Sequence, residues 1–362
     1  MMAIKRLDMA DIPETEGRGS NPQQVAKYAK SLVRWFKNYR DYVVQGAWYP
    51  DEVFSDQGSS HSRKLIVDKN SLEYPKFMTL PKSMQVFNLM KKSKLYEEPY
   101  IHVMGNVCDR CDAMAHTIVD NFKIQYREDK GNPIGPTSTH MAMRFFIMSH
   151  YIADAHMPLH CDGRPMDYLH TAIEENWENQ VFASYRIDED NRRFFYDPDG
   201  FPLATDSMSN MIKKVEEEIV KREFIYSWSG KDYSTRDYIK AVTEYSYLMA
   251  HEMIPDEILP KESNRYTWGK YKKQEVFSHF DEYSAMVMAD AVDSIARAWL
   301  HVWIRYREWG PDKLPEKKPK KNGKDKAPEE PEPNLSEASI IENAIAADEA
   351  ISKSKGKGKA KK

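Results

Sequence analysis

The sequence predicts an all-α fold, a multi-helix bundle followed by a disordered and charged C-terminal tail. Apolar residues recur at intervals of three and four through most of the chain, whereas the alternating apolar and polar runs typical of strands are scarce. With 41% hydrophobic and 12% aromatic residues among 362, the chain can fill the core of a large domain. Near the end, the segment KLPEKKPKKNGKDKAPEEPEPN has too few apolar side chains to offset the entropy cost of ordering.

The apolar periodicity predicts a series of helices. Their expected bounds are residues 22–45, 80–92, 103–127, 138–157, 168–184, 206–225, 235–253 and 272–306. The last segment is the clearest, because Tyr283, Trp299 and Tyr306 belong to a broad apolar stripe suited to the centre of a bundle. Residues 194–206, FFYDPDGFPLATD, read as a turn-rich excursion that can include a small hairpin.

The composition divides the chain into three expected parts. Residues 1–21 are a flexible N-terminal arm, residues 22–309 the helical domain and residues 310–362 the disordered tail, rich in Lys, Pro and Glu. Within the tail, residues 336–352 can form a short helix, and the final KSKGKGKAKK is dense in lysine. Such a run is typical of a solvated tail, and it can also contact nucleic acid or a protein partner.

Charge, apolar runs and cysteine content bear on partners and compartment. A formal net charge of -3 gives no global field that favours nucleic acid or an acidic membrane. The N-terminal MMAIKRLDMADIPETEGRGS lacks the apolar run of a signal peptide, and no stretch reaches the roughly 18 apolar residues that span a bilayer. We therefore expect a cytoplasmic protein without a transmembrane segment. Cys108 and Cys111 form a CxxC on a helical pattern, and with only three cysteines present they read as reduced thiols.

A metal-binding pattern lies in the apolar segment FFIMSHYIADAHMPLHCDGRPMDYLHTAIEENW. His150 and Asp154 are four residues apart on a helix, so both side chains leave the same face. A proline then turns the chain so that His160 can approach from a loop, and His170 and Glu174 repeat the four-residue spacing on the next helix. Imidazole nitrogens with carboxylate oxygens and no thiolate fit zinc best, and manganese or iron are alternatives. We expect these five side chains to share metal ions.

The motif resembles one known superfamily. It reads His150-Tyr-Ile-Ala-Asp154-Ala-His156-Met-Pro158-Leu-His160, followed by His170-Thr-Ala-Ile-Glu174. The zinc-dependent phospholipases C and the secreted single-strand-specific nucleases share the hallmark H-x3-D-x-H-Q-P-L-H and then H-x3-D/E, so Met157 stands where the family has Gln. The resemblance implies an all-helical fold with a cluster of zinc ions.

The resemblance also implies ligands from an earlier segment, QGAWYPDEVFSDQGSSH, at Asp51 and His61, with Asp56 as a competitor of Asp51. One zinc would be held by Asp51, His61, His150 and Asp154, and a second by His160, His170 and Glu174. His156 would orient one of the ligands. The family holds a third zinc through an N-terminal Trp and an early His, which this chain lacks, so two zinc ions are expected.

The helical domain is then expected to be a zinc-dependent phosphodiester hydrolase that acts through a metal-bound hydroxide. Asp51 would orient or deprotonate the attacking water, and Asp154 would bridge metals. We favour a nuclease, an endonuclease acting on single-stranded nucleic acid, because 21 Tyr and 8 Trp can stack bases and the tail is lysine-rich. Glu174 points to the first alternative, a phospholipase C-type hydrolase of phospholipid head groups. The second alternative is a non-catalytic helical scaffold stabilised by metal.

Overall fold

A computed structural model describes residues 1–9, 22–56, 58–67, 100–127, 136–164, 167–188, 193–222, 224, 226, 234–254 and 280–309. The expected helix over residues 80–92 and the tail over 310–362, with its short helix, lie outside these residues. The same holds for the first residues of the last expected helix, 272–279.

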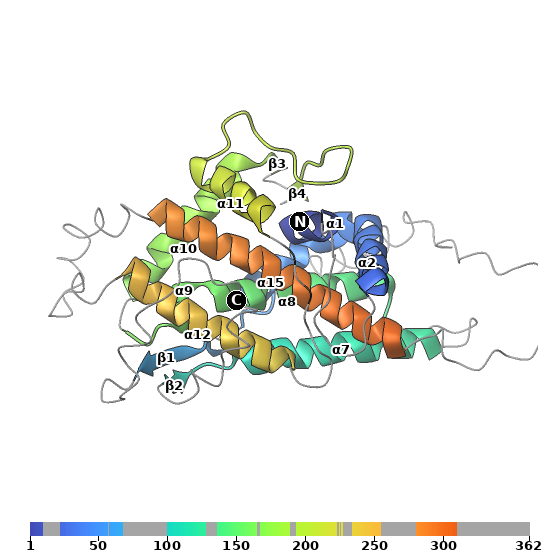
Figure 1. Ribbon diagram of the computed structural model, residues 1–362, viewed down its shortest axis with the longest axis horizontal. Coiled ribbons are helices and arrows are strands. Elements are labelled where there is room, and N and C mark those ends of the chain that lie inside the picture. Colours follow the sequence, from blue (N-terminus) through green and yellow to red (C-terminus); the bar gives the residue numbers. More distant parts are fainter. Residues whose placement is uncertain are drawn as a thin grey trace, which may run out of the picture. The chain divides into compact units, whose positions relative to one another are not determined.

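The described part of the chain is mostly helical, as the sequence predicts (Figure 1). The helices are α1 (Met2–Asp8), α2 (Pro22–Val43), the 3-10 helix η1 (Val44–Trp48), α3 (Tyr49–Glu52), α4 (Gly58–His61), α7 (Val107–Arg127), α8 (Ser138–His156), α9 (Pro158–Cys161), α10 (Asp167–Ser184), α11 (Asn210–Lys221), α12 (Thr235–Met253) and α15 (Phe280–Trp309). The strands are β1 (Lys64–Val67), β2 (Tyr100–Met104), β3 (Ile187–Asp188) and β4 (Arg193–Phe194). No helix among these residues is long and apolar enough to cross a bilayer.

The core is built around α15, which contacts α1, α2, α7, α8, α11 and α12 (orange in Figure 1). Trp299, in the middle of α15, is buried against Phe36 of α2 and against Phe145 and Phe146 of α8, with ring centroids 4.7, 6.4 and 5.3 Å away. Its indole Nε1 donates a hydrogen bond of 2.8 Å to the carbonyl oxygen of Phe145. Replacing Trp299 with alanine would cost about 3–5 kcal/mol of unfolding free energy. This packing holds α8, the helix that carries part of the metal pattern, rigidly in the core.

Side-chain caps and a proline set the bounds of the helices. Thr137 and Ser209 begin α8 and α11, and each side chain accepts a hydrogen bond from the backbone N–H three residues later. Ser234 and Asp237 form a capping box at the start of α12. At the end of α8, Met157 is extended because Pro158 follows it, and Pro158 then occupies the first turn of α9. The proline thus produces the turn that the metal pattern requires.

Some expected bounds differ from the structure. The segment Met2–Asp8 forms α1, with Ile4 and Leu7 fully buried, although a flexible arm was expected there. Burial of these apolar side chains against α2 and α15 stabilises a helix too short to persist alone. The helix expected from residue 103 begins at Val107, because the preceding residues pair with β1 as strand β2. The helix expected from residue 206 begins at Asn210, after its cap.

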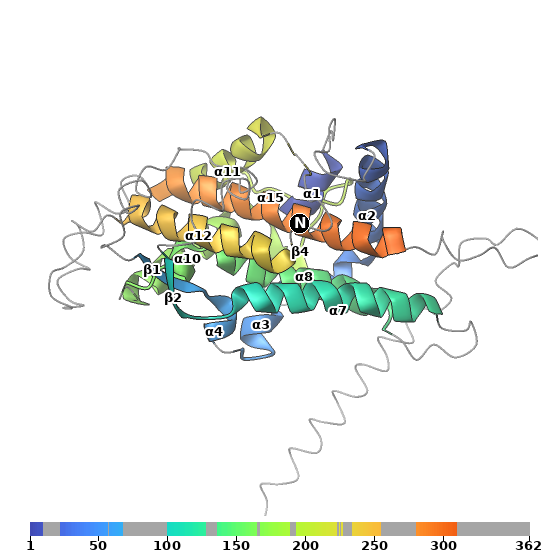
Figure 2. The same cartoon turned by 60° about the horizontal axis from the view of Figure 1, so that its bottom comes forward.

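Two small antiparallel sheets complete the described residues. β1 pairs with β2, and β3 pairs with β4 as a hairpin that leads into the expected turn-rich excursion. Two glycines allow close approaches near the metal pattern. A Cβ at Gly46 of η1 would lie 2.9 Å from the carbonyl oxygen of Met143 in α8, and Gly105, with a φ of +94°, lies against Ser62. As a result, the segment that carries α3 and α4 lies directly on α8 and α7 (Figure 2).

Candidate metal centre

The metal pattern is positioned by α8, the short α9 and α10. His150 and Asp154 lie one turn apart near the C-terminal end of α8, and the His150 Nε2 atom is 3.1 Å from Asp154 Oδ2. His160 lies in α9, directly after the turn at Pro158. The helical spacing of the sequence therefore produces the shared face that we expected.

A first ligand group consists of Asp51, His61, His150 and Asp154, contributed by α3, α4 and α8. The His61 Nδ1 atom lies 2.8 Å from Asp154 Oδ2 and 3.1 Å from His150 Nε2. Asp51 approaches from the exposed side, with carboxylate oxygens 3.5 Å from His150 Nε2 and 3.7 Å from His61 Nε2. The structure thus brings together the four residues that the resemblance implied for one metal ion.

A second ligand group consists of His160, His170 and Glu174, from α9 and α10. The Nε2 atoms of His160 and His170 are 2.7 Å apart, and Glu174 Oε1 is 3.1 and 2.8 Å from them respectively. Asp154 Oδ1 lies 3.8 Å from His160 Nδ1, the ring nitrogen that does not contact His170 or Glu174. The three residues implied for a second ion also converge.

Hydrogen bonds to backbone carbonyl oxygens connect the two ligand groups. The His160 Nδ1–H donates a hydrogen bond of 2.8 Å to the carbonyl oxygen of His61, and the Arg63 N–H donates one of 3.2 Å to the carbonyl oxygen of His160. The first of these bonds places the His160 proton on Nδ1, so that Nε2 directs its lone pair toward His170 and Glu174. His61 therefore contributes a side chain to one group and orients a ligand of the other.

Both groups place ligand atoms close enough together to hold a metal ion. Tetrahedral zinc with Zn–N distances of about 2.0–2.1 Å places neighbouring ligand atoms roughly 3.3 Å apart. The separations here, from 2.7 Å between His160 and His170 to 3.5 Å between His150 and Asp51, bracket that value. In addition, the buried Nε2 atom of His61 has no hydrogen-bond partner among the described residues. A cation bound at this Nε2 atom would satisfy it, and that ion would then not also bind the Nδ1 atom that lies 2.8 Å from Asp154 Oδ2.

Electrostatics keep the carboxylates ionised. Burial alone would raise the pKa of Asp154, but hydrogen bonds with His150 and His61 outweigh it and hold that pKa well below its usual range. Burial would likewise raise the pKa of Glu174, and its two histidine partners lower it to about 2. For His150 and His160, burial lowers the pKa, yet the adjacent carboxylates raise it overall. Protons on these imidazoles compete with a metal ion, so metal affinity should rise with pH.

A separate network holds Asp56, the expected competitor of Asp51. Arg110 of α7 donates hydrogen bonds from Nη2 to Asp56 Oδ2 at 2.6 Å and to the Tyr151 hydroxyl at 3.0 Å. The Tyr151 hydroxyl also donates to Asp56, and the Tyr151 ring lies 5.3 Å from the His61 ring. Asp56 is therefore occupied in fastening the segment that carries Asp51, and Asp51 is the carboxylate within reach of the histidines.

His156 does not play its expected role as a residue that orients a ligand. Its Nε2 lies 2.8 Å from the Ser294 hydroxyl, which is 2.9 Å from the Tyr238 hydroxyl, and all three side chains are buried in the core. Because His156 lies two residues after Asp154 on the helix, its side chain leaves a different face of α8. The backbone carbonyl of His61 supplies the orienting contact instead.

The cysteines lie apart from the ligand groups. Cys108, Cys111 and Cys161 are free and buried, and burial raises the pKa of the Cys108 thiol to about 11. The Sγ atom of Cys161 lies 3.4 Å from the carbonyl oxygen of Ala155, although its neighbour His160 is a candidate ligand. These reduced thiols agree with the prediction from the sequence.

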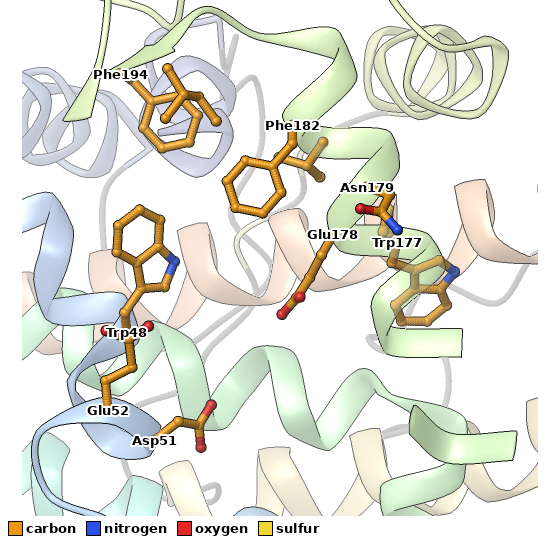
Figure 3. Close-up of a pocket in the computed structure, with 11 residues that line it drawn as sticks. Trp48, Asp51, Glu52, Trp177, Glu178, Asn179, Phe182 and Phe194 are labelled. Carbon is orange, nitrogen blue, oxygen red and sulfur yellow. The ribbon is translucent and has the colours of Figure 1, made fainter. Parts of the chain in front are cut away.

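A cleft of about 830 Å³ opens beside the first ligand group and includes Asp51 in its wall (Figure 3). Aromatic side chains line it from η1, α10 and β4, together with Glu52 of α3 and Glu178 of α10. No motif in the sequence marks these lining residues. One signal was present, because Glu178 follows Glu174 by four residues and so lies on the same face of the helix.

Comparison with protein-family models, with curated proteins and with solved structures finds no match to this chain.

Proposed function

We propose that this protein is a metal-dependent phosphodiester hydrolase, with zinc as the metal that suits its ligands best. The observation that carries the proposal is the presence of two adjacent ligand groups beside an open cleft. In each group three residues have ligand atoms within 4.8 Å of one another: Asp51, His61 and His150 in the first, and His160, His170 and Glu174 in the second. A structural zinc site needs only one closed set of four ligands, whereas two linked sets next to a cleft are typical of hydrolytic centres.

Most of these residues would act as metal ligands, and one of them would also accept a proton. Asp51, His61, His150 and Asp154 would hold one ion, and the second ligand group would hold another. When bound, such ions supply positive charge to phosphoryl oxygens and lower the pKa of water. The Asp51 side chain is 64% exposed at the cleft, so one of its carboxylate oxygens can accept a proton from an attacking water.

Asp154 lies where the two groups meet. Its Oδ2 faces the two histidines of the first group, and its Oδ1 faces His160. The low pKa of Asp154 keeps both oxygens available to cations. Its Oδ1 lies beside the Nδ1 atom of His160 and not beside the Nε2 atom that would bind the second ion, so the bridging role stays a prediction. Replacement of Asp154 should disturb the first group most.

The test combines metal content with turnover. The full chain is loaded with zinc, and zinc per chain and hydrolysis of bis(p-nitrophenyl) phosphate are measured with and without a chelator. We expect two zinc ions per chain and hydrolysis that the chelator abolishes. His150→Ala and His160→Ala should lose zinc and turnover together, whereas His140→Ala, an exposed histidine on the same helix α8, should retain both.

Two outcomes would overturn the proposal. Full zinc content and turnover in both ligand variants would show that these side chains do not form the centre. Tightly bound zinc whose removal lowers the melting temperature, without hydrolysis of any phosphodiester in the loaded protein, would instead establish the scaffold function.

A further inference from the structure

Strand β2 has a backbone edge that no described residue pairs. β1 and β2 form a two-stranded sheet, and the other edge of β1 is occupied, because Gly163 donates a backbone hydrogen bond of 2.8 Å to the carbonyl oxygen of Leu65. Within the described part of the chain β2 pairs with β1 alone, and it is the outer strand of the sheet (Figure 1 and Figure 2). The N–H and C=O groups of residues 101–104 that point away from β1 are therefore open to a further strand.

One face of this sheet is apolar and exposed to solvent. Ile66 of β1 lies directly opposite Ile101 of β2, and Val103 follows two residues later on the same face. Ile66, Ile101 and Val103 are 38%, 48% and 53% exposed, whereas Leu65, on the opposite face, is fully buried. An apolar face thus lies next to an unpaired backbone edge, which is the combination that favours the addition of a strand.

The charge of the strands favours a second copy of β2 as the partner. β2 reads Tyr-Ile-His-Val-Met, without the lysine, other charged residues or proline that usually protect an exposed edge. Each of the other described strands contains a charged side chain, Lys64 in β1, Asp188 in β3 and Arg193 in β4. Pairing with any of these would place a charge at the new edge, whereas pairing of β2 with itself places none there.

The sequence of β2 is also self-complementary. In an antiparallel pair with a two-fold axis beside His102, Ile101 of each chain lies opposite Val103 of the second copy. Cross-strand pairs of β-branched side chains stabilise a sheet, and the symmetry forms this pair twice. The exposed apolar face then continues from Ile66 and Ile101 across the axis into the second copy.

We propose that β2 is a dimerisation edge, at which two copies of this chain pair their β2 strands antiparallel about an axis at His102 and form one four-stranded sheet. The interface is small, so the dimer is reversible, with a Kd of about 10–100 μM. The inference is independent of the proposed function, because the candidate metal ligands lie outside β1 and β2.

The first test measures the mass of the full chain in solution. Sedimentation velocity over a range that spans the expected Kd should show the mass rise from one chain toward two. Ile101→Lys and Val103→Lys place a charge opposite an apolar side chain at two symmetric positions, so each should raise Kd by about tenfold or more. Ile124→Lys, at a similarly exposed position of α7, is the matched control and should leave Kd unchanged.

The second test examines the register by cross-linking. Directly opposed residues have Cβ atoms about 4.5–5.5 Å apart, close to the reach of a disulfide. Position 104 of one chain would lie roughly 13 Å along the strands from position 104 of the other. With oxidised glutathione as the oxidant, which is reduced to two thiols for each disulfide formed, His102→Cys should give a covalent dimer and Met104→Cys should not. The three native cysteines are buried and serve as the background in the unaltered chain.

Three outcomes would overturn the inference. The first is a single chain at every concentration, including the case in which an added apolar peptide binds the edge instead. The second is a dimer that both lysine variants leave intact, with melting temperatures showing that these variants are folded. The third is cross-linking through Met104→Cys but not through His102→Cys, which would contradict an axis at His102.

Discussion

The two ligand groups reach similar geometry by different routes. The second group comes from a short stretch of sequence, with His160 in α9 and His170 and Glu174 one turn apart in α10. The first group draws Asp51 and His61 from α3 and α4 to meet α8, about a hundred residues later in the chain. One group is thus mainly a product of helix periodicity, and the other depends on tertiary packing.

The burial and support of the groups differ in the same way. In the first group the side chains of His61, His150 and Asp154 are 8%, 14% and 15% exposed, and the segment before His61 is fastened by the network around Asp56. In the second group the side chain of Glu174 is 40% exposed, and its partner His170 lies one turn earlier on the same helix. We therefore expect the first group to be sensitive to distant changes and the second to local ones.

The largest expected effects come from removing one histidine of each group. His150→Ala and His170→Ala should each lose one of the two zinc ions, because each removes a ligand atom from only one group. Loss of one ion removes several kcal/mol of transition-state stabilisation, so kcat/KM for bis(p-nitrophenyl) phosphate should fall by about a thousandfold or more in each variant. Metal analysis after dialysis and steady-state kinetics measure the two effects.

Release of both ions from a single variant would contradict the expectation that each ligand group binds its own ion. That result would mean that the centre is one cooperative cluster, coupled through Asp154 and the bond from His160 to the His61 carbonyl. The exposed His116→Gln, in α7, serves as the control for a general effect of losing a histidine.

A smaller effect should follow when the support of the first group is removed at a distance. Tyr151→Phe deletes the hydroxyl that bonds to Asp56 and Arg110, so the segment carrying Asp51 is held less firmly. Loss of such a supporting bond typically weakens metal binding by about 10- to 100-fold. Competition with a chelator should show this weakening for one ion only, with the second ion bound as before.

The matched control for this change is Tyr185→Phe, which removes a hydroxyl that bonds to Glu216 away from both groups. Unchanged affinity for both ions in Tyr151→Phe would show that Asp51 needs no such anchor. Equal weakening of both ions would show that the network supports the whole centre.

The contrast between the groups also explains what the sequence could predict. Helix periodicity and a proline-containing turn suffice to place His150, Asp154, His160, His170 and Glu174, because all of them lie within consecutive short helices. Most helix positions followed from the same periodicity. The observed helix bounds differ from the expected ones where a capping residue or strand pairing sets the end of the helix, as at Val107. Such contacts are not visible in the local spacing of apolar residues.

The roles of several site residues depend on tertiary packing, which cannot be predicted from the spacing of residues in the sequence. Asp51 and Asp56 are equivalent by spacing, and only the contact of Asp56 with Arg110 and Tyr151 separates them. His156 belongs to the motif by position, yet the direction of its side chain is set by the core around Ser294. The cleft joins walls from η1 and α10, so its negative lining could not be read from either segment alone.

A modest change within the second group tests its local character. Glu174→Asp shortens the side chain by one methylene, so the carboxylate withdraws from the histidine nitrogens that now lie 2.8 and 3.1 Å from Oε1. Zinc affinity of this group should fall by about tenfold, within the range for disturbed metal ligands, without loss of the other ion. Undiminished affinity in the chelator competition would indicate that α10 adjusts freely.

The smallest expected effect is a pH-dependent loss of stability caused by His156, which is buried in α8 and belongs to neither ligand group. Burial lowers the pKa of His156 from 6.5 to about 3, so the folded protein keeps it neutral while the unfolded chain takes up a proton below pH 6.5. The stability that this neutral histidine contributes is present above pH 6.5 and is lost as the pH falls toward 3. Between pH 6.5 and 5.5 the loss amounts to about 1 kcal/mol.

The variant His156→Gln has no imidazole to titrate. The unaltered chain should therefore lose about 1 kcal/mol of unfolding free energy relative to this variant when the pH falls from 6.5 to 5.5. Urea denaturation at the two pH values measures the change. Any loss of metal on acidification affects both proteins equally and cancels in the difference. A difference that stays constant with pH would mean that His156 takes up a proton in the folded state, and that its place beside Ser294 is less isolated from water than its burial indicates.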